Sequence, residues 1–466
     1  MSDTTDAPWR GDACSLVDAF RSGERSPVEE LDATLGAIEA SDLNAFVWLD
    51  TDAARERAAS ADTSKPFGGV PVGIKALDQV EGWPYTEECL VFQDRTADYT
   101  STHIDRMVGI GGINPIGQTL ASEFGGLNVS TNLLHGTCHN PWEHGRTAGG
   151  SSGGSSSAVA GGLVTIASGG DGGGSIRIPA GFCGLVGMKG TAGRIPRGPK
   201  TLIAPMTVVV GCQARSVRDV ARWYDVATGY DMRDPYSLPR IDGWERDLGS
   251  FDLKGKKVAI LPTLGSAIVR DEVQERVVSA GEALARDAGL EIVEIECGLQ
   301  PIDLHWALGN LSGLFEDLRG LWPECKEQLT KSTWRGLEIA EKLLDLDMVA
   351  KGEAARTVAN EAMAAMFDEV DFVIAATNPD TAFPAEVMAN TRVGDQKVGA
   401  GNNGTLTIPA NMTGNPAISI PVEPFGGLPV GMQVIGRHHE DQLLLDLARI
   451  VEQTAPWPLV APGAPH

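Results

Sequence analysis

The chain has 466 residues, of which 42% are hydrophobic and 21% charged, a composition typical of a soluble globular protein and not of a disordered or membrane-inserted one. Its formal net charge of −24 argues against nucleic acid and anionic membranes as partners, because both bind through clustered lysine and arginine side chains. Seven scattered cysteines without a Cys-x-x-Cys pair predict neither a disulfide framework nor a zinc site. Residues 1–6 lack the basic and apolar regions of a signal peptide, so we expect a cytoplasmic protein.

The first predicted elements lead to a lysine. Residues 26–29, Ser-Pro-Val-Glu, form a capping box with proline at the first helical position, and they predict a helix that runs to about Glu39. Residues 44–49 are largely apolar and predict a strand. Residues 67–75 predict a turn followed by a second strand, which ends at Lys75.

The most glycine-rich part of the chain lies between residues 149 and 180 and holds two serine-bearing loops, at 149–155 and 171–175. Residues 158–160 and 163–167 between them are apolar and predict a helical piece and a strand, which argues against a flexible linker. Neither loop is closed by Gly-Lys-Ser or Gly-Lys-Thr, so a phosphate-binding loop is not indicated. Because glycine in such numbers costs backbone entropy, we interpret both loops as parts of a site with unusual dihedral angles or exposed amides.

Residues 149–153 also match the Gly-x-Ser-x-Gly turn of α/β-hydrolase-type esterases, in which Ser151 would be the nucleophile of a Ser-His-Asp triad. That turn needs a strand immediately before it, but residues 144–148 are polar and small and predict none. The chain has only eight histidines, so a base other than imidazole has to be considered. The histidines that follow Ser151 in the chain are His305, His438, His439 and His466.

The second half of the chain predicts more strands of a sheet that is covered by helices. The predicted strands lie at 257–261, 291–295, 370–375 and 417–420. A helix over about 271–288 completes a β-α-β unit, and residues from 299 to about 368 are mainly helical. Because no internal repeat or long linker divides the chain, we predict one α/β domain over residues 1–466, with a central mixed, mostly parallel sheet covered by helices.

Short motifs rich in glycine and proline recur along the chain. They lie at 69–75, 117–119, 140–142, 149–155, 173–180, 182–189, 193–194, 414–419 and 427–436. One such motif alone is weak evidence, but the ordered set resembles the amidase signature family of serine hydrolases over nearly the whole chain. The resemblance implies the amidase signature fold, with core motifs at about 69–194 and 411–436 and a variable substrate-pocket region at about 300–400.

The same resemblance implies a catalytic triad made of a lysine and two serines. Ser175 would be the nucleophile, Ser151 a serine on a cis peptide bond that relays the proton, and Lys75 the base. The scarcity of histidine agrees with a lysine base. The resemblance implies neither a metal nor a cofactor. It places the oxyanion hole at the backbone amides of Gly172, Gly173, Gly174 and Ser175.

A lysine base imposes a demanding requirement on the site. At its reference pKa of about 10.4, lysine is neutral in roughly one molecule in 2,500 at pH 7. Burial is one way to lower that pKa, because it disfavours the ammonium. The neighbours Ile74, Ala76 and Leu77 are apolar, whereas the family commonly has aspartate directly after the lysine. The nearest acid here is Asp78, and we hypothesise that Lys75 loses its proton more easily without a carboxylate at position 76.

Further residues are assigned by the resemblance or by their charge. Gly125 and Gly126 lie where relatives place the wall beside the scissile bond and are candidate substrate-binding residues. Asp171 and Arg177 are charged neighbours of the nucleophile, and we expect them to pair and hold the loop. The large apolar residues of the variable region that either line a pocket or pack between helices are Trp306, Leu311, Leu314, Phe315, Trp322 and Trp334.

The implied function is an amidase that hydrolyses the C–N bond of small linear amides through an acyl-enzyme. Carbamate, hydrazide or ester hydrolysis within the family remains an alternative, as do a glutamyl-tRNA amidotransferase A-type subunit, an α/β-hydrolase-type esterase and a non-catalytic subunit. Gln118 stands where the family commonly has lysine, which weakens the match to the amidotransferase. We expect a small-molecule amide or carbamate substrate, no nucleic-acid or membrane partner, and either a monomer or a homodimer.

Overall fold

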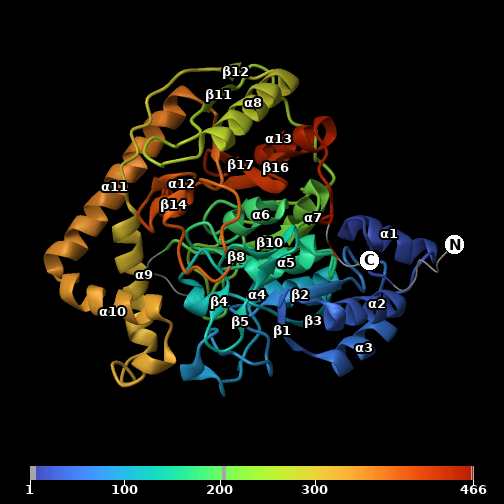
Figure 1. Ribbon diagram of the computed structural model, residues 1–466. Coiled ribbons are helices and arrows are strands. Elements are labelled where there is room, and N and C mark those ends of the chain that lie inside the picture. The colour runs from blue at the N-terminus through green and yellow to red at the C-terminus, as the bar shows by residue number, and fades with distance from the viewer. Residues whose placement is uncertain (1–6, 202–205, 463, 465–466) are drawn as a thin grey trace.

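The computed structural model describes residues 7–201, 206–462 and 464, so residues 1–6 and His466 lie outside the described part of the chain. One sheet of eleven strands runs through the molecule (Figure 1). In spatial order its strands are β1 (Phe46–Leu49), β3 (Asn114–Thr119), β2 (Pro71–Lys75), β8 (Ile166–Asp171), β10 (Val209–Ala214), β9 (Val186–Lys189), β16 (Ala417–Phe425), β17 (Leu428–Gly436), β13 (Phe372–Ala376), β11 (Lys257–Ile260) and β12 (Glu291–Ile292). The prediction of one large α/β domain with a mixed sheet flanked by helices is confirmed.

The sheet contains fewer parallel pairs than the sequence predicts. Parallel pairing joins β2 to β3 and β8, and joins β11 to β12 and β13, whereas the other neighbouring strands of the sheet are antiparallel. A parallel pair needs a long crossover connection, usually a helix, whereas strands joined by a tight turn pair in the antiparallel direction. β16 and β17 are joined in this way by Gly426 and Gly427, which both have positive φ angles. The β-α-β pattern seen around residue 270 is therefore not typical of the whole sheet.

Short strands outside the main sheet form two-stranded ribbons. They are β4 (Thr131–Asn132) with β5 (Gly136–Thr137), β6 (His139–Asn140) with β7 (Glu143–Thr147), and β14 (Arg392–Val393) with β15 (Gln396–Lys397). The prediction of no strand before Gly149 is wrong, because β7 lies there. Most residues of β7 are exposed or half-buried, which explains why no apolar pattern marks it. Because β7 is not a strand of the main sheet, it does not supply the strand that the α/β-hydrolase turn requires.

Helices cover the sheet on both faces and at its ends (Figure 1). The predicted capping box is present, since Ser26 Oγ accepts the N–H of Glu29 (3.2 Å) and Glu29 Oε2 accepts the N–H of Ser26 (2.7 Å). The helices are α1 (Ala13–Ser22), α2 (Pro27–Ala40), α3 (Thr51–Ala59), α4 (Thr102–Arg106), α5 (Gly153–Ala160), α6 (Arg177–Cys183), α7 (Val217–Ala227), α8 (Asp271–Ala288), α9 (Asp303–Asp317), α10 (Lys331–Leu343), α11 (Leu346–Glu369), α12 (Asn402–Thr413) and α13 (Asp441–Thr454). Single turns of other helix types lie at Leu90–Phe92, Met107–Gly111, Glu123–Gly125 and Lys326–Gln328.

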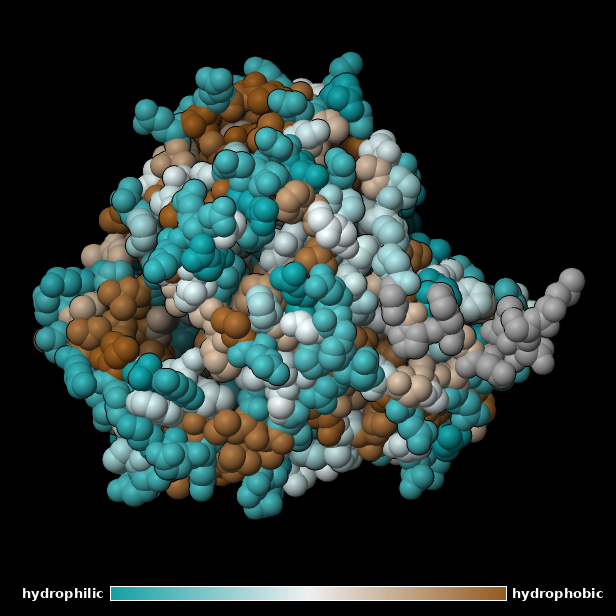
Figure 2. Space-filling model, viewed as in Figure 1, coloured by the Kyte–Doolittle hydropathy of each residue, from teal (hydrophilic) through white to brown (hydrophobic). Residues whose placement is uncertain are grey.

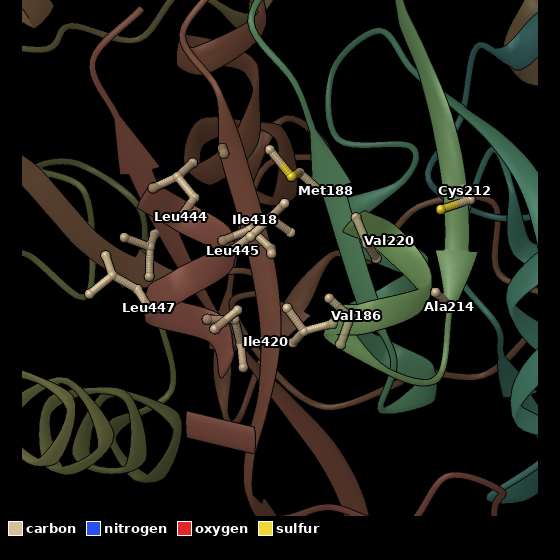
Figure 3. Close-up of a cluster of buried hydrophobic side chains, with 14 of the residues drawn as sticks. Val186, Met188, Cys212, Ala214, Val220, Ile418, Ile420, Leu444, Leu445 and Leu447 are labelled. Carbon is tan, nitrogen blue, oxygen red and sulfur yellow. The ribbon is translucent and has the colours of Figure 1, made fainter. Parts of the chain in front are cut away.

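One face of the sheet is covered by α7, α8 and α13, of which α13 packs against the other two. Side chains alternate between the two faces of a strand, so residues two apart point to the same side. Figure 3 shows this face, where α13 and α7 lie over β9, β10 and β16. The labelled residues of this core are Val186, Met188, Cys212, Ala214, Val220, Ile418, Ile420, Leu444, Leu445 and Leu447.

Helix α6 lies close against the sheet at two strand glycines. A Cβ atom on Gly431 of β17 would lie 2.8 Å from the Cα atom of Gly181 in α6. A Cβ atom on Gly187 of β9 would lie 2.6 Å from the Cβ atom of Ala180 in the same helix. This close approach fixes α6, and with it the loop from β8 to α6, relative to the strands.

Helices α9, α10 and α11 form an arm beside the sheet, at the left of the view in Figure 1. The arm is joined to the body at Glu123, whose buried carboxylate accepts the N–H (3.0 Å) and the hydroxyl (2.6 Å) of Thr330 at the start of α10. Figure 2 shows a largely hydrophilic face with an apolar patch at the left, over α10 and α11. The exposed apolar residues at the junction of these two helices are Ile339, Leu343, Leu346 and Val349.

The core in Figure 3 makes a prediction about stability. Ile418 is completely buried beneath α13, so Ile418→Ala should lower the free energy of unfolding by about 2–5 kcal/mol through lost burial and the cavity left behind. The matched control is Ile339→Ala on α10, where the side chain is 51% exposed and a change within about 0.5 kcal/mol is expected. Urea unfolding measures both, and equal losses would contradict the assignment of this core.

Candidate active site

Lys75 is the last residue of β2 and is buried, with 3% of its surface exposed. Its Nζ atom lies 2.8 Å from Ser151 Oγ and 3.3 Å from the carbonyl oxygen of Gly170 in β8. The backbone N–H of Lys75 donates to Ser168 Oγ (2.8 Å), and the Ser168 hydroxyl donates to Asp78 Oδ2 (2.6 Å). The parallel pairing of β2 with β8 places Lys75 beside Ser168 and Gly170, and the loop before α5 brings the predicted relay serine to its amine.

Burial controls the protonation of Lys75. Removing the ammonium from water lowers the pKa of Lys75 from 10.5 to about 8. The negative charges that oppose this shift belong, in decreasing order, to Asp78, Asp171, Glu87 and Glu88. With a pKa near 8, about a tenth of the molecules hold a neutral amine at pH 7, far more than for a lysine in water.

Ser151 lies in the loop that leads into α5. The peptide bond between Gly150 and Ser151 is cis, as the resemblance implies. Glycine is required here because the loop packs closely against its neighbours. A Cβ atom on Gly149 would lie 2.8 Å from the Cα atom of Pro179 in α6, and one on Gly150 would lie 2.5 Å from the backbone nitrogen of Val129. The loop that carries Ser151 is thus packed against α6.

Ser175 lies on the turn between β8 and α6 and is partly exposed. A buried ion pair holds this turn: Arg177 Nε donates to Asp171 Oδ2 at 2.9 Å, and neither side chain is exposed. Burial alone would raise the pKa of Asp171, but the charge and hydrogen bonds of Arg177 hold it well below its usual range. The predicted structural role of this pair is confirmed. Among the described residues, no hydrogen bond joins Ser175 Oγ to Ser151 Oγ, so the contact present within the predicted triad is that of Lys75 with Ser151.

The backbone amides around Ser175 differ in whether they are already engaged. The N–H of Gly174 donates to Asp171 Oδ1 at 2.7 Å. Within the described ranges, the N–H groups of Gly172, Gly173 and Ser175 have no hydrogen-bond acceptor. The amides that can donate a hydrogen bond to a substrate oxygen are therefore those of Gly172, Gly173 and Ser175. We keep the predicted oxyanion hole as a proposal for these three amides.

Gly125 and Gly126 lie in and just after the turn at Glu123–Gly125. A Cβ atom on Gly125 would lie 3.5 Å from Ser151 Oγ, whereas one on Gly126 would meet only the carbonyl oxygen of Glu123, at 3.6 Å. Gly125 has a φ of +70°, and Phe124 before it has a φ of +51°, which is uncommon for a residue with a side chain. A side chain at position 125 would press against the buried Ser151, so glycine leaves space beside the hydroxyl of the predicted relay serine.

Most of the large apolar residues of the variable region pack between elements. Leu311, Leu314, Trp322 and Trp334 belong to a cluster that also includes Phe92 and Phe124. Phe315 is partly exposed on α9. Trp306 is different, because its Nε1–H donates to the carbonyl oxygen of Gly172 at 2.7 Å. One of the six candidates therefore contacts the loop of the predicted nucleophile.

Two other residues that contact this loop were missed by sequence reasoning. Thr407 Oγ1 donates to the carbonyl oxygen of Gly173 at 2.6 Å, and Asn411 Nδ2 donates to the carbonyl oxygen of Asp171 at 2.9 Å. Both lie on α12, far along the chain from the loop. Asn411 begins the second core motif region, but nothing local in the sequence indicates which atoms these side chains contact.

The described histidines that follow Ser151 make other contacts. His305 Nδ1 lies near Gly352 of α11, His438 Nε2 lies 2.8 Å from the carbonyl oxygen of Thr413, and His439 lies beside Arg194. His466 is outside the described residues. Since Ser151 Oγ contacts a lysine amine, the arrangement does not favour a Ser-His-Asp triad at this serine.

One group of side chains in the described structure could hold a metal ion, namely Asp12, Cys14 and Asp219. Asp219 accepts the N–H groups of Ala13 (3.0 Å) and Cys14 (2.9 Å) and so caps the start of α1. The seven cysteines are free thiols, and all except Cys297 are buried. No helix in the described ranges is both long and apolar enough to cross a membrane.

The family model described as Amidase matches residues 29–445. This chain belongs to the amidase signature family. An acylamidase of Rhodococcus erythropolis is 32% identical to it over 96% of this chain and 95% of that protein. The A subunit of glutamyl-tRNA(Gln) amidotransferase from Synechococcus sp. (strain CC9605) is also 32% identical, over 97% of this chain and 96% of that protein.

Solved structures of amidase signature enzymes show the same fold. The structure of a bacterial aryl acylamidase of this family superimposes with a TM-score of 0.90 and 26% identity, over 96% of this chain and 97% of that one. The structure of 6-aminohexanoate cyclic dimer hydrolase gives a TM-score of 0.87 at 25% identity, over 98% and 99% of the two chains. The amidase signature fold implied by the sequence motifs is therefore confirmed.

The charges around Lys75 make a prediction that needs no substrate. Asp78→Asn removes the largest charge that opposes the effect of burial, so the pKa of Lys75 should fall below about 8. The chemical shift of the Lys75 Cε carbon, followed by NMR against pH in protein with labelled lysine, measures this pKa. Glu81→Gln, at an exposed carboxylate on the same segment, serves as the control. An ordinary lysine pKa in the wild type, or a rise in Asp78→Asn, would contradict this electrostatic account.

Proposed function

We propose that this protein is a serine amidohydrolase that cleaves the C–N bond of small linear amides through an acyl-enzyme on Ser175. The observation that carries the proposal is the 2.8 Å contact between Lys75 Nζ and Ser151 Oγ, in surroundings that lower the pKa of Lys75 to about 8. A neutral amine at this position is an acceptor for a serine proton near neutral pH. Membership of the amidase signature family supports the same reaction.

In the first step of this mechanism, Lys75 accepts the proton of Ser151, and Ser151 Oγ accepts that of Ser175. Ser175 Oγ forms a bond to the carbonyl carbon of the amide, and the carbonyl oxygen becomes an oxyanion. The N–H groups of Gly172, Gly173 and Ser175 stabilise that charge. Catalytic hydrogen bonds are often long in a free enzyme and shorten when substrate binds, which accounts for the lack of a Ser151–Ser175 bond here.

In the second step the C–N bond breaks, and the leaving nitrogen takes the proton that Lys75 had accepted, passed back through Ser151. Water then attacks the acyl-enzyme, and its proton travels by the same relay to Lys75. The bond between Ser175 Oγ and the carbonyl carbon breaks, and Ser175 regains its proton through Ser151. The reaction consumes one water, releases an acid and an amine or ammonia, and restores the enzyme.

The substrates that the comparisons favour are acyl amides of aryl or aliphatic amines, because two of the similar proteins are an acylamidase and an aryl acylamidase. A Cβ atom on Gly126 would meet only the carbonyl oxygen of Glu123, so this exposed position leaves room for a substrate group. Carbamates, hydrazides and esters have the same acyl carbon and remain alternative substrates for this site. The match to amidotransferase A subunits makes glutamine a further candidate. A screen with anilides, aliphatic amides, glutamine, carbamates, hydrazides and esters separates these classes.

The triad makes a direct prediction. Ser175→Ala, Ser151→Ala and Lys75→Ala should each lower kcat by about 10³-fold or more on a substrate such as para-nitroacetanilide, because each removes one member of the relay. Ser156→Ala is the matched control, since this serine lies on α5 close to Ser151 in sequence and its buried hydroxyl has no partner among the described residues. The control should keep wild-type turnover. Full activity in any of the three triad variants would contradict the mechanism.

Covalent labelling identifies the nucleophile independently of the natural substrate. A fluorophosphonate should modify Ser175 in the wild-type protein, as read by peptide mass spectrometry, and should not react in Lys75→Ala at a comparable rate. Modification of Ser151 alone, with an essential histidine, would instead support an α/β-hydrolase-type esterase. A protein that neither reacts with the probe nor hydrolyses any member of the screen would be a non-catalytic subunit.

A further inference from the structure

The loop that carries the proposed oxyanion donors is held by side chains from two helices that are remote in sequence. Its consecutive carbonyl oxygens, those of Asp171, Gly172 and Gly173, each accept a side-chain hydrogen bond. The donors are Asn411 Nδ2 to Asp171 (2.9 Å), Trp306 Nε1 to Gly172 (2.7 Å) and Thr407 Oγ1 to Gly173 (2.6 Å). Thr407 and Asn411 lie one helical turn apart on the same face of α12, and Trp306 lies on α9.

Peptide planarity converts these carbonyl contacts into control of the amides. A trans peptide unit is flat, so its N–H points in the opposite direction from its C=O. The hydrogen bond from Trp306 to the Gly172 carbonyl therefore fixes the direction of the Gly173 N–H. The bond from Asn411 to the Asp171 carbonyl fixes the Gly172 N–H in the same way. Both are amides without an acceptor among the described residues.

Thr407 controls the next peptide unit. Its hydroxyl bonds the Gly173 carbonyl and so fixes the Gly174 N–H, which donates to Asp171 Oδ1 at 2.7 Å. A Cβ atom on Gly174, whose φ is +130°, would lie 2.5 Å from Thr407 Oγ1. Thr407 thus locks the peptide unit between Gly173 and Gly174, which is next to the unit that carries the Ser175 N–H. The loop is held on its carbonyl side, and its remaining amides point the other way.

The indole of Trp306 lies against the loop itself. A Cβ atom on Gly173 would lie 2.6 Å from Trp306 Cζ2 and 2.9 Å from Cε2. Glycine at 173 is therefore what allows the Nε1–H to reach the carbonyl of Gly172. Gly173 in turn depends on Trp306, because glycine can adopt many backbone conformations and an external contact is needed to hold one of them.

We propose that Trp306 and Thr407 are positioning residues of the oxyanion hole: Trp306 aims the Gly173 amide at the charge that develops on the substrate oxygen, and Thr407 holds the next peptide unit, whose Gly174 amide is turned to Asp171. This inference rests on the proposed function. Oxyanion stabilisation depends on donors that are already oriented when the reaction begins, so loss of either carbonyl contact lowers the rate of the chemical step more than substrate binding. Neither residue needs to touch the substrate for this effect.

The test removes each hydrogen bond and keeps a side chain of similar shape at 407 and an aromatic ring at 306. Thr407→Val and Trp306→Phe should each lower kcat on para-nitroacetanilide by about 10- to 100-fold, with KM changed by less than about twofold. Thr407→Ser retains the hydroxyl and should recover most of the wild-type kcat. The acid limb of the pH–rate profile should stay where it is in all three variants, because the contact of Lys75 with Ser151 is not altered.

Matched controls come from the same helices and the same arm. Thr405→Val lies on α12, where the hydroxyl donates to the carbonyl oxygen of Gly401 just before the helix (3.4 Å). Trp334→Phe lies on α10, where Lys326 Nζ lies over the ring at 4.0 Å. Within the described residues, neither side chain has a hydrogen bond to the loop at 171–175. Both should keep the wild-type kcat. Melting temperatures show which variants are folded, and either Thr407→Val or Trp306→Phe is sufficient for the test.

The outcomes separate this inference from the function on which it rests. A wild-type kcat in the folded Thr407→Val and Trp306→Phe variants, or a loss in Thr407→Val that Thr407→Ser does not restore, would overturn the positioning role alone. A wild-type protein that hydrolyses no amide and is not labelled at Ser175 would overturn the proposed function and this inference with it. A loss of kcat with rescue by Thr407→Ser supports both.

Discussion

A lysine amine held out of water, against a serine hydroxyl, is the constraint on which the rest of this structure depends. Lys75 ends a buried strand, and its Nζ atom lies between Ser151 Oγ and the carbonyl of Gly170. Burial lowers its pKa, and the carboxylate of Asp78, held by Ser168, opposes that effect. Burial and the charge of Asp78 therefore shift the pKa of Lys75 in opposite directions. The net result is an amine that can be neutral near physiological pH.

The second requirement is a loop that is both glycine-rich and rigid, and here long-range contacts supply the rigidity. The buried Arg177 pairs with Asp171 and also bonds Asn411 Oδ1 (2.6 Å) and the carbonyl oxygen of Thr407 (3.0 Å). Its guanidinium reaches Gln433 in β17 as well, at 3.2 Å. A buried charge pair is costly unless further hydrogen bonds satisfy it, and this one is satisfied from the loop, from α12 and from the sheet. The same network thus joins the loop to α12, whose Thr407 contacts the Gly173 carbonyl.

The sequence predicts the local elements and the family well, because both depend on patterns of residues that are close together in the chain. The capping box at 26–29, the strand that ends at Lys75 and the strands of the second half all depend on neighbouring residues, and the structure contains them. The proportion of antiparallel pairs was not predictable from the β-α-β unit, because pairing across a sheet is decided by connections that the pattern of one unit does not describe.

Local pattern also fails for polar or remote segments. The exposed strand β7 has no apolar pattern, so the prediction that no strand precedes Gly149 was wrong. Trp306 and Thr407 lie more than a hundred residues from the loop that they contact, and a tryptophan or a threonine carries no sign of a distant hydrogen-bond partner. The hydrogen bond from the Gly174 N–H to Asp171 likewise becomes visible only in the folded loop.

In the proposed mechanism, neutral Lys75 activates Ser175 through Ser151. The most direct measurement is the rate constant for fluorophosphonate modification of Ser175 as a function of pH. Since the protonated lysine cannot accept a proton, the reaction should be slow at low pH, become faster through the pKa of Lys75 at about 8, and reach a plateau above it. A rise centred on the ordinary histidine pKa of about 6.5, or a rate independent of pH, would contradict this mechanism.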